Sequence, residues 1–276
     1  MPFAGLDIGS TMTKAVILDG QGVMIASVIG PTGAEHRHLA LAVMDETTKK
    51  AGINFEGLDF IVATGYGRIN VPFADKQITE ITCHSRSVRA LFPTARIIID
   101  IGGQDSKGIK LDGQGKVTNF VMNDKCAAGT GRFLEVIAET LGIKLTEMGE
   151  LSLKAKKYVR ISNTCTVFAE HEVTTKLTEG ATIPEIVAGL HEAFAGRVVN
   201  MVRSLGIEKE VVVTGGGAMN IGLIKAVEQK VGFRVLVPPE PLLTGALGAA
   251  FMGKDLLARG VTSERKRKLE GVTFFK

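Results

Sequence analysis

Apolar residues along the chain form short uninterrupted runs that alternate with longer stretches of helical spacing. The short runs end in glycine-containing turns, and each run predicts a buried strand. Residues 3–29 contain three predicted strands, of which the last is at 23–29. Further strands are predicted at the start of 60–68, within 96–123, at the start of 210–220 and at 234–239.

The longer stretches predict helices between these strands. We expect them at 34–51, at 75–91, from about Thr130 to Gly142, from Cys165 onward, from Pro184 to Gly206 and at 243–252. The order of strands followed by a helix occurs twice, and glycine loops stand at the strand ends. This order is typical of α/β proteins that bind a ligand at the carboxyl ends of their strands.

One segment of the chain is repeated. Residues 7–22 read DIGSTMTKAVILDGQG, and residues 100–115 read DIGGQDSKGIKLDGQG. Nine of the sixteen aligned positions are identical, namely D, I, G, K, L, D, G, Q and G. Repetition of a glycine loop, an apolar run and a turn indicates a duplicated structural unit.

The repeated unit is suited to phosphate chemistry. In each copy an apolar strand ends in an aspartate, small residues follow, and a lysine opens the next strand. Glycine lets the backbone turn tightly, and the exposed N–H groups of such a turn can bind phosphate oxygens. An aspartate at the strand end can hold Mg²⁺, which prefers carboxylate and phosphate oxygens. Two such hairpins predict a clamp for a nucleoside triphosphate.

A third glycine loop, TGGGAMN at 214–220, follows a predicted strand. It lacks the GxGxxG spacing of a dinucleotide site, and the chain contains no GxxxxGK[S/T] motif. Taken with the two hairpins, this loop is interpreted as the one that approaches adenosine.

Composition narrows the classes of protein. The 276 residues carry a net charge of +4, too small to imply nucleic-acid binding, and no apolar run is long enough to cross a bilayer. The chain passes directly into its first strand, so we expect no signal peptide and a cytoplasmic protein. Its three cysteines argue against a disulfide framework and for reduced thiols or metal ligands.

Longer motifs carry a family resemblance that runs from residue 4 to residue 253. They are GLDIGST, ATGYGR, ADKQITEITCH, DIGGQD, NDKCAAGTGRFLE, TCTVFAE, TGGGAMN and GALGAA. With them the chain resembles the superfamily of actin, heat-shock ATPases and sugar kinases. Within it the sequence is similar to the activators (archerases) of 2-hydroxyacyl-CoA dehydratases and to the ATP-binding subunits of benzoyl-CoA reductases.

The resemblance implies a two-lobed actin-like ATPase of the α/β class, with a ribonuclease H-like core and ATP in the cleft between the lobes. The expected first lobe comprises 1–95 and a returning segment at about 240–260. The second lobe comprises 96–239, and 261–276 forms a basic tail that is interpreted as a solvated end.

The motif match also assigns roles to residues. Asp7 and Asp100 are the expected Mg²⁺ carboxylates, Gln104 the candidate for orienting the attacking water, and Asp105 the reserve candidate. The first phosphate loop comprises Gly9, Ser10 and Thr11, and the second Gly102 and Gly103. Lys14 or Lys107 neutralises phosphate, unless both are solvated hairpin charges. Gly215, Gly216 and Gly217 approach the adenosine.

Two cysteines precede predicted helices, where the positive end of the helix dipole favours a thiolate. Cys126 and Cys165 are too few for an iron–sulfur cluster, which takes four thiolates, but a symmetric dimer supplies four. The resemblance implies one 4Fe–4S cluster shared across such a dimer. Two small buried hydrophobes, or a zinc site with His171, are the alternatives. Cys83 is interpreted as a packing residue, and its neighbour His84 as a satisfied or exposed helix residue and not a ligand.

The resemblance further implies an electron-transfer ATPase. It would take one electron from reduced ferredoxin or flavodoxin and use ATP to drive it onto a dehydratase, a benzoyl-CoA reductase or another double-cubane iron–sulfur reductase. A homodimer and a heterodimer with a paralogue both fit. The rivals are a small-molecule kinase with Asp105 as catalytic carboxylate, and an actin-like filament ATPase; neither gives the cysteines a task.

Overall fold

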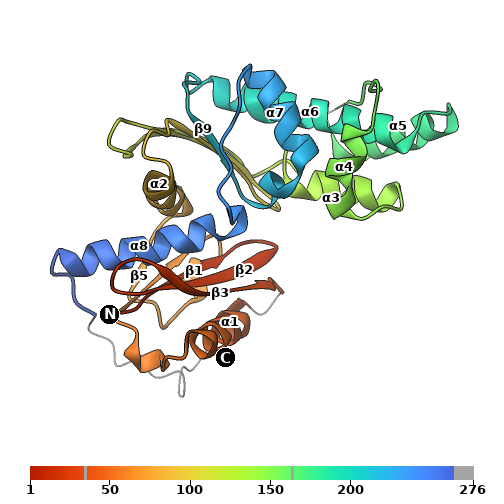
Figure 1. Cartoon of the computed structure of the whole chain (residues 1–276). Helices are drawn as coiled ribbons and strands as arrows, with labels where there is room; N and C mark the ends of the chain where they lie inside the picture. The colour runs from red at the N-terminus through yellow and green to blue at the C-terminus, as the bar shows by residue number, and fades with distance from the viewer. Residues whose placement is uncertain (34–35, 163–164, 264–276) are drawn as a thin grey trace. The chain divides into compact units, whose positions relative to one another are not determined.

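The computed structural model describes residues 1–33, 36–162 and 165–263. The chain divides into two compact units, each built on one mixed sheet with helices on it (Figure 1). Unit 1 comprises Met1–Pro93, Gln114–Val117 and the described residues from Leu242 onward; unit 2 comprises Thr94–Gly113 and Thr118–Pro241. Within the described ranges, no helix combines the length and the apolar character needed to cross a bilayer.

Unit 1 holds a five-stranded sheet in the order β3-β2-β1-β4-β5. Its strands are β1 (Phe3–Ile8), β2 (Met12–Leu18), β3 (Met24–Pro31), β4 (Phe60–Thr64) and β5 (Lys76–Gln77). β1 pairs antiparallel with β2 and parallel with β4. The carboxyl ends of β1 and β4 therefore lie at the same edge of the sheet, as the sequence order predicts.

Helices cover both faces of this sheet. They are α1 (His36–Ala51), α2 (Glu80–Leu91) and α8 (Thr244–Ala258). Side chains alternate along β1, so Leu6 and Ile8 pack in a cluster with α1, while Gly5 and Asp7 face α8. A methyl group on Gly5 would lie 1.9 Å from the Ala246 carbonyl oxygen, so α8 rests directly on β1. The packing thus places Asp7 beneath the first turn of α8.

Unit 2 holds a four-stranded sheet in the order β8-β7-β6-β9. Its strands are β6 (Ile97–Ile101), β7 (Ser106–Leu111), β8 (Val117–Asn123) and β9 (Val211–Thr214). β6 pairs antiparallel with β7 and parallel with β9. This is the pairing of β1 with β2 and β4, so the repeated sequence folds into a repeated structure.

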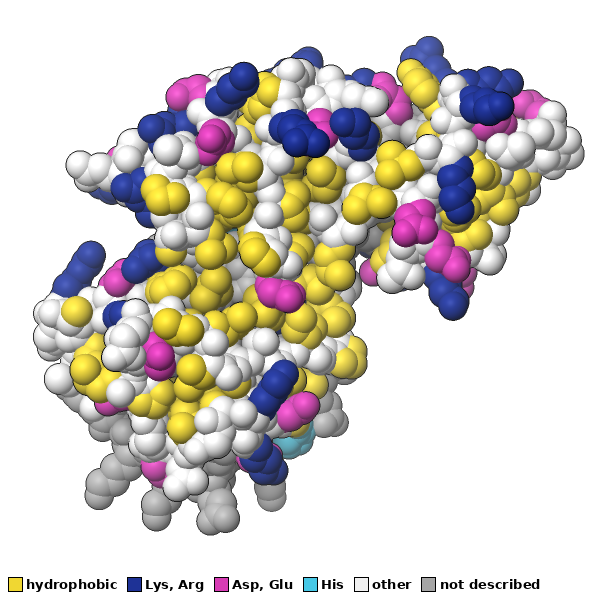
Figure 2. All heavy atoms as spheres, viewed as in Figure 1, with side chains coloured by type: hydrophobic (Ala, Val, Ile, Leu, Met, Phe, Trp, Pro, Cys, Tyr) yellow, Lys and Arg dark blue, Asp and Glu magenta, His cyan; other side chains and the backbone are white. Residues whose placement is uncertain are grey.

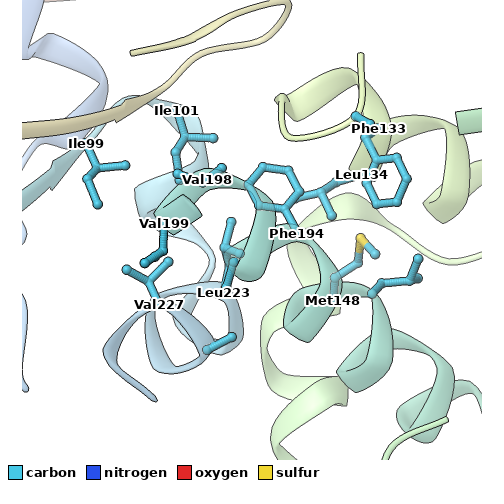
Figure 3. Close-up of a cluster of buried hydrophobic side chains, with 14 of the residues drawn as sticks. Ile99, Ile101, Phe133, Leu134, Met148, Phe194, Val198, Val199, Leu223 and Val227 are labelled. Carbon is cyan, nitrogen blue, oxygen red and sulfur yellow. The ribbon is translucent and has the colours of Figure 1, made fainter. Parts of the chain in front are cut away.

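Five helices complete the described part of unit 2: α3 (Gly131–Thr140), α4 (Met148–Leu153), α5 (Thr166–Thr178), α6 (Ile183–Arg203) and α7 (Ile221–Val231). α6 begins in a capping box, in which Thr182 and Glu185 each bond the other's backbone N–H. Its apolar side packs Phe194 and Val198 against Ile101 of the sheet and Leu223 of α7 (Figure 3). Figure 1 shows α3, α4 and α5 together at the end of unit 2 away from β9.

Short 3₁₀ turns connect several of these elements. They are η1 (Phe55–Gly57), η2 (Arg68–Asn70), η3 (Leu145–Glu147), η4 (Gly216–Met219) and η5 (Pro241–Leu243).

The structure corrects two predicted elements. The helix predicted at 75–91 begins only at Glu80, because Asp75 accepts the Ile61 N–H at 2.6 Å and the next two residues pair with β4 as β5. The strand predicted at 234–239 reduces to one bridge between Val212 and Leu236. Two consecutive prolines, Pro238 and Pro239, lack the N–H groups that would continue it.

Candidate functional site

In unit 1 the repeated hairpin brings an aspartate and a lysine face to face. Asp7 is the penultimate residue of β1 and is 7% exposed, and Lys14 lies directly across the antiparallel ladder on β2. The Lys14 Nζ lies 3.2 Å from Asp7 Oδ2, and both side chains are mostly buried. Lys14 is therefore an ion-pair partner, which excludes the interpretation of this lysine as a solvated hairpin charge.

Unit 2 repeats the pair in the same register. Asp100 lies opposite Lys107, with Lys107 Nζ 3.5 Å from Asp100 Oδ2. A second carboxylate joins here, because Asp105 Oδ2 lies 2.7 Å from the same Nζ. Lys107 is 4% exposed, so it too is a buried partner and not a solvated charge. Two carboxyl groups beside one lysine offer the oxygen ligands that suit a divalent cation.

The neighbouring parallel strand adds a Thr-Gly pair in both units. Thr64 is registered with Asp7, and Thr214 with Asp100. The Thr214 hydroxyl donates to Asp100 Oδ1 at 2.9 Å. The sequence analysis did not identify Thr64 as the counterpart of Thr214, although FIVATG and EVVVTG both show an apolar run that ends in Thr-Gly.

The glycine after each threonine lies where a side chain would be strained and crowded. Gly65 has φ +84° and Gly215 has φ +80°, values that side-chain-bearing residues rarely adopt. A methyl group on Gly65 would lie 2.3 Å from Asp7 Oδ1, and one on Gly215 would lie 2.4 Å from the Ile101 carbonyl oxygen. Both glycines therefore let the backbone pass directly against the strand that carries the aspartate.

The predicted phosphate loops are tight hairpin turns. The Gly9 N–H donates to the Met12 carbonyl at 3.1 Å, and the Gly102 N–H donates to the Asp105 carbonyl at 2.9 Å. These two N–H groups are therefore used inside the turns. Gln104 is exposed at the tip of the second turn.

The remaining loop residues differ in exposure. Ser10 and Thr11 in the first turn, and Gly103 in the second, are partly exposed. Of the predicted adenosine loop, Gly216 is exposed, whereas Gly217 packs against the Ile101 side chain.

A charged and polar environment surrounds Asp7 on the α8 side. A methyl group on Gly245, in the first turn of α8, would lie 2.9 Å from Asp7 Oδ2 and 3.3 Å from His84 Nε2. The positive end of the α8 dipole therefore faces the carboxylate. His84 is 6% exposed and lies beside the Asp7 carboxylate, a neighbour that the interpretation of His84 as an ordinary helix residue did not include.

The structure places Cys126 in a turn that precedes α3, and we call residues 123–130 the cysteine turn. The Asn123 side chain holds this turn: its amide donates to the carbonyls of Cys126 at 2.9 Å and Ala128 at 3.1 Å, and its oxygen accepts the Cys126 N–H at 3.3 Å. Cys126 is half-buried, so its thiol is neither a core residue nor freely solvated.

The first turn of α3 is attached to the second phosphate loop. The Gly131 N–H donates to the Gly102 carbonyl at 2.8 Å, and the Arg132 N–H donates to the Gly103 carbonyl at 2.7 Å. A methyl group on Gly131 would lie 3.1 Å from the Gly102 oxygen, so glycine permits the approach. The first four backbone N–H groups of an α-helix have no acceptor within the helix. In α3, two of these N–H groups donate to carbonyls of the loop.

Cys165 is the N-cap residue of α5 and is also half-buried. Two side chains in the first turn of this helix, Val167 and Phe168, are 68% and 67% exposed. Figure 2 shows apolar side chains gathered at the end of unit 2 that contains α3, α4 and α5. His171 is exposed on α5, and within the described ranges no three His, Cys, Asp or Glu side chains form a metal-binding group. The zinc alternative therefore gains no support.

Cys83 differs from the other two cysteines. It lies on α2, fully buried against the sheet and Ala249 of α8, and burial raises the pKa of its thiol to about 12. A thiol with this pKa stays protonated at neutral pH and is a poor metal ligand or nucleophile. The interpretation of Cys83 as a packing residue agrees with this burial.

A buried histidine contacts Asn220, the residue that ends the triple-glycine loop. His191 on α6 is 1% exposed, and its Nε2 lies 3.0 Å from Asn220 Nδ2. The Asn220 oxygen in turn accepts the Leu223 N–H and caps α7. Burial lowers the pKa of His191 to about 4, so the ring is neutral at pH 7 and can accept the amide hydrogen.

Comparison with known proteins gives consistent matches over nearly the whole chain. The model of the BadF/BadG/BcrA/BcrD ATPase family matches residues 4–253. The 2-hydroxyisocaproyl-CoA dehydratase activator of Clostridioides difficile is 46% identical over 256 residues, which cover 91% of this chain and 94% of that protein. The activator of lactoyl-CoA dehydratase of Anaerotignum propionicum is 49% identical over 248 residues, covering 89% and 95%.

Solved structures give the same picture of the fold. The structure of the 2-hydroxyisocaproyl-CoA dehydratase activator from Clostridium difficile with bound ADPNP superposes with a TM-score of 0.89 at 45% identity, covering 94% of this chain and 97% of that one. A ROK family glucokinase from Streptomyces griseus superposes with a TM-score of 0.57 at 12% identity, covering 92% and 100%. The second likeness concerns the fold alone and confirms the predicted α/β actin-like and sugar-kinase class.

Proposed function

The chain belongs to the BadF/BadG/BcrA/BcrD ATPase family, and from this premise we propose that it is an ATP-hydrolysing electron-transfer activator. It takes one low-potential electron from reduced ferredoxin or flavodoxin and drives it onto a partner iron–sulfur enzyme. The named relatives activate 2-hydroxyacyl-CoA dehydratases, and a further relative, 32% identical over 260 residues, belongs to the benzoyl-CoA reductase of Thauera aromatica. The partner is therefore a dehydratase or reductase of CoA thioesters.

One structural observation carries this proposal. Two amides in the first turn of α3 donate to the carbonyls of Gly102 and Gly103, and the cysteine turn immediately precedes that helix. The loop that is suited to phosphate is therefore bonded to the first turn of α3, and the cysteine that is suited to a metal centre lies in the turn that leads into this helix. Such a link is what an ATP-driven change at a thiolate-bound centre requires.

The repeated hairpins bind ATP and Mg²⁺. Asp7 and Asp100 hold the ion, directly or through water, because they are buried carboxylates at strand ends. Lys14 and Lys107 hold these carboxylates in place and become available to phosphate oxygens when the ion takes over the carboxylate charge. The backbones of Ser10, Thr11 and Gly103 bind phosphate, and Gly215, Gly216 and Gly217 approach the adenosine.

Two residues in the second hairpin are candidates for activating water. Gln104 is exposed at the turn, so its amide is available to orient a water toward the terminal phosphate. Asp105 is the reserve candidate. It is engaged with Lys107 at 2.7 Å, which favours a structural role for this carboxylate over general-base catalysis.

The two half-buried cysteines fit an iron–sulfur ligand set better than they fit a role in packing. Cys126 lies in a turn fixed by Asn123 and packs only partly against the core, Cys165 is the N-cap residue of α5, and neither is fully buried as Cys83 is. One chain supplies two thiolates, so a dimer, homomeric or with a paralogue, would complete the four ligands of one 4Fe–4S cluster. That cluster would supply a one-electron site.

Nucleotide acts on the cysteine turn through the chain itself. When phosphate and Mg²⁺ bind the second hairpin, the carbonyls of Gly102 and Gly103 shift with the loop. The first turn of α3 follows because its N–H groups are bonded to those carbonyls. The turn that holds Cys126 is continuous with that helix, so the thiolate moves relative to its surroundings.

The remaining features complete the proposal. We infer that the protein works in the cytoplasm, that the lobes of the repeat are 1–95 with about 240–260 and 96–239, and that 261–276 is a basic tail. Residues 264–276 lie outside the described residues. Activation of another double-cubane reductase stays an alternative. A small-molecule kinase is disfavoured because its reaction does not require Cys126 and Cys165.

Iron and acid-labile sulfide measured after anaerobic purification test the proposal. We expect about four irons per dimer, lost in Cys126→Ala and in Cys165→Ala. The matched control is Cys83→Ala, which removes a buried thiol and keeps the iron. An iron-free protein that hydrolyses ATP, even after reconstitution with iron and sulfide, would reject the electron-transfer function and favour the kinase.

A further inference from the structure

Ser106 makes a buried side-chain link between the second hairpin and the cysteine turn. It is the first residue of β7, directly after Asp105, and is 1% exposed. Its hydroxyl donates to the Gly129 carbonyl at 2.8 Å. A buried hydroxyl bonded to a carbonyl holds its partner firmly, because breaking the bond leaves an unsatisfied polar group without water.

The cysteine turn can transmit a displacement of Gly129 because it is bonded internally. The Thr130 N–H and hydroxyl both bond the Ala127 carbonyl, at 3.0 and 2.8 Å. At the other end of the turn, the Asn123 side-chain amide donates to the carbonyls of both Cys126 and Ala128. These bonds hold the turn together, with Ser106 bonded to Gly129 near its α3 end and Cys126 in its middle.

The bond of Ser106 adds to two backbone bonds that also join the second hairpin to the region around the cysteine turn. The two backbone bonds run from Gly131 to Gly102 and from Arg132 to Gly103. The bond of Ser106 is the side-chain member of this set, and side-chain substitution can remove it alone.

The first hairpin carries a matching residue with a different partner. Thr13 precedes Lys14 as Ser106 precedes Lys107, and it is fully buried. Its hydroxyl lies 2.9 Å from the Thr32 hydroxyl, next to the end of β3. The buried hydroxyl is thus common to both copies, whereas the contact with a cysteine turn belongs to the second.

We propose that Ser106 is a positioning residue that couples the nucleotide-binding hairpin to the turn that holds Cys126. The proposal rests on the proposed function for the identity of the ligand, a nucleoside triphosphate with Mg²⁺. It adds the residue through which binding at 102–105 reaches the cysteine turn, beyond the backbone bonds of α3.

Amide hydrogen exchange, followed by mass spectrometry with and without Mg²⁺ and ADPNP, tests this coupling in the full-length protein. In the wild type, nucleotide should slow exchange at least about fivefold in peptides covering 102–105 and 123–132, the lower end of ordinary coupling strengths. In Ser106→Ala, protection at 102–105 should remain while the effect at 123–132 falls below about twofold. The KM for ATP should change by less than about twofold.

Matched variants separate coupling from general loosening. Thr13→Ala removes the equivalent buried hydroxyl in the other hairpin, and Ser106→Thr restores a hydroxyl that the repeat itself uses at this position. Both should respond to nucleotide as the wild type does. If Ser106→Ala does not fold, Ser106→Cys carries the test, because a thiol of similar size is a weaker donor.

Each outcome has a defined meaning. An undiminished nucleotide effect at 123–132 in Ser106→Ala overturns the role of Ser106 and leaves the proposed function standing. Equal losses in Ser106→Ala and Thr13→Ala also overturn it, because the effect would then be general. Absence of nucleotide protection at 102–105 in the wild type contradicts the proposed nucleotide site itself.

Discussion

The two copies of the repeated hairpin carry the same chemical groups in different surroundings. In each copy a strand-end aspartate faces a lysine across an antiparallel ladder, and a Thr-Gly pair joins from a parallel strand. In unit 1 the aspartate lies beneath the first turn of α8 and beside His84. In unit 2 the lysine bonds a second carboxylate, and the adjoining loop is bonded to α3.

This difference separates shared chemistry from specialised function. The groups that the repeat preserves are the ones that nucleotide and Mg²⁺ need. The groups that differ determine where a change at the nucleotide is transmitted. We therefore expect unit 2 to dominate catalysis and coupling, while unit 1 supplies binding.

Removal of the strand-end carboxylates should have the largest effect. Asp100→Asn should lower the kcat of ATP hydrolysis by about 10³-fold and Asp7→Asn by about 10²-fold, the range for losing one electrostatic group at a reacting centre. The larger effect is expected at Asp100 because Gln104 and Asp105 belong to the same hairpin. Steady-state ATPase assays at saturating Mg²⁺ measure both, and a larger loss in Asp7→Asn would reverse the assignment of units.

Substitution of the paired glycines should destabilise both units alike. Gly65→Ala and Gly215→Ala each place a methyl group within 2.5 Å of strand atoms and hold alanine at a positive φ. We expect each to lower the free energy of unfolding by more than about 3 kcal/mol, from unfavourable backbone and steric overlap. Urea unfolding measures this loss. If one alanine variant is as stable as the wild type, the two glycines are not structural equivalents.

The buried histidine should give unit 2 an acid-sensitive stability. The unfolded chain binds a proton at His191 near pH 6.5, whereas the folded chain binds it only near pH 4. Stability therefore falls as the pH drops through this window, by about 3 kcal/mol in total from this group. His191→Gln keeps an acceptor for the Asn220 amide and cannot titrate in this range.

Urea unfolding at intervals from pH 7 to pH 4 compares the two proteins. The His191→Gln curve should be flatter than that of the wild type over this window and parallel to it above pH 7. Curves that stay parallel down to pH 4 would show that His191 titrates normally in the folded protein.

Thiol modification should show the smallest difference, and it separates Cys83 from the other cysteines. With a pKa of about 12, Cys83 carries almost no thiolate at pH 8 and is buried. In iron-free folded protein, iodoacetamide should therefore modify Cys126 and Cys165 at least about tenfold faster than Cys83. Peptide mass spectrometry resolves the three sites, and equal rates would place Cys83 in an accessible environment.

The sequence predicts the repeated part of this fold well. Identity between 7–22 and 100–115 specifies two hairpins, and the structure adds that Asp7 faces Lys14 and Asp100 faces Lys107 in the same register. Strand-end carboxylates and glycine turns are local features, so a local pattern can reveal them.

Features that depend on contacts between distant segments were missed. His84 lies next to Asp7 only because α2 and α8 pack on one face of the sheet. No local sequence pattern predicts that contact. The bonds from Gly131 and Arg132 to the second hairpin likewise join segments almost thirty residues apart. The predicted strand at 234–239 was wrong for a local reason. The prediction followed its apolar pattern, although the two prolines at its end were visible in the sequence.

Electron paramagnetic resonance of the dithionite-reduced protein, with and without Mg²⁺ and ATP, tests the central claim most directly. We predict an iron–sulfur signal whose shape changes on nucleotide addition in the wild type. In Asp100→Asn the iron should remain and the nucleotide-induced change should be lost. An iron-containing wild type whose signal is unaffected by ATP while ATP is hydrolysed would contradict a link between the second hairpin and the cysteine turn.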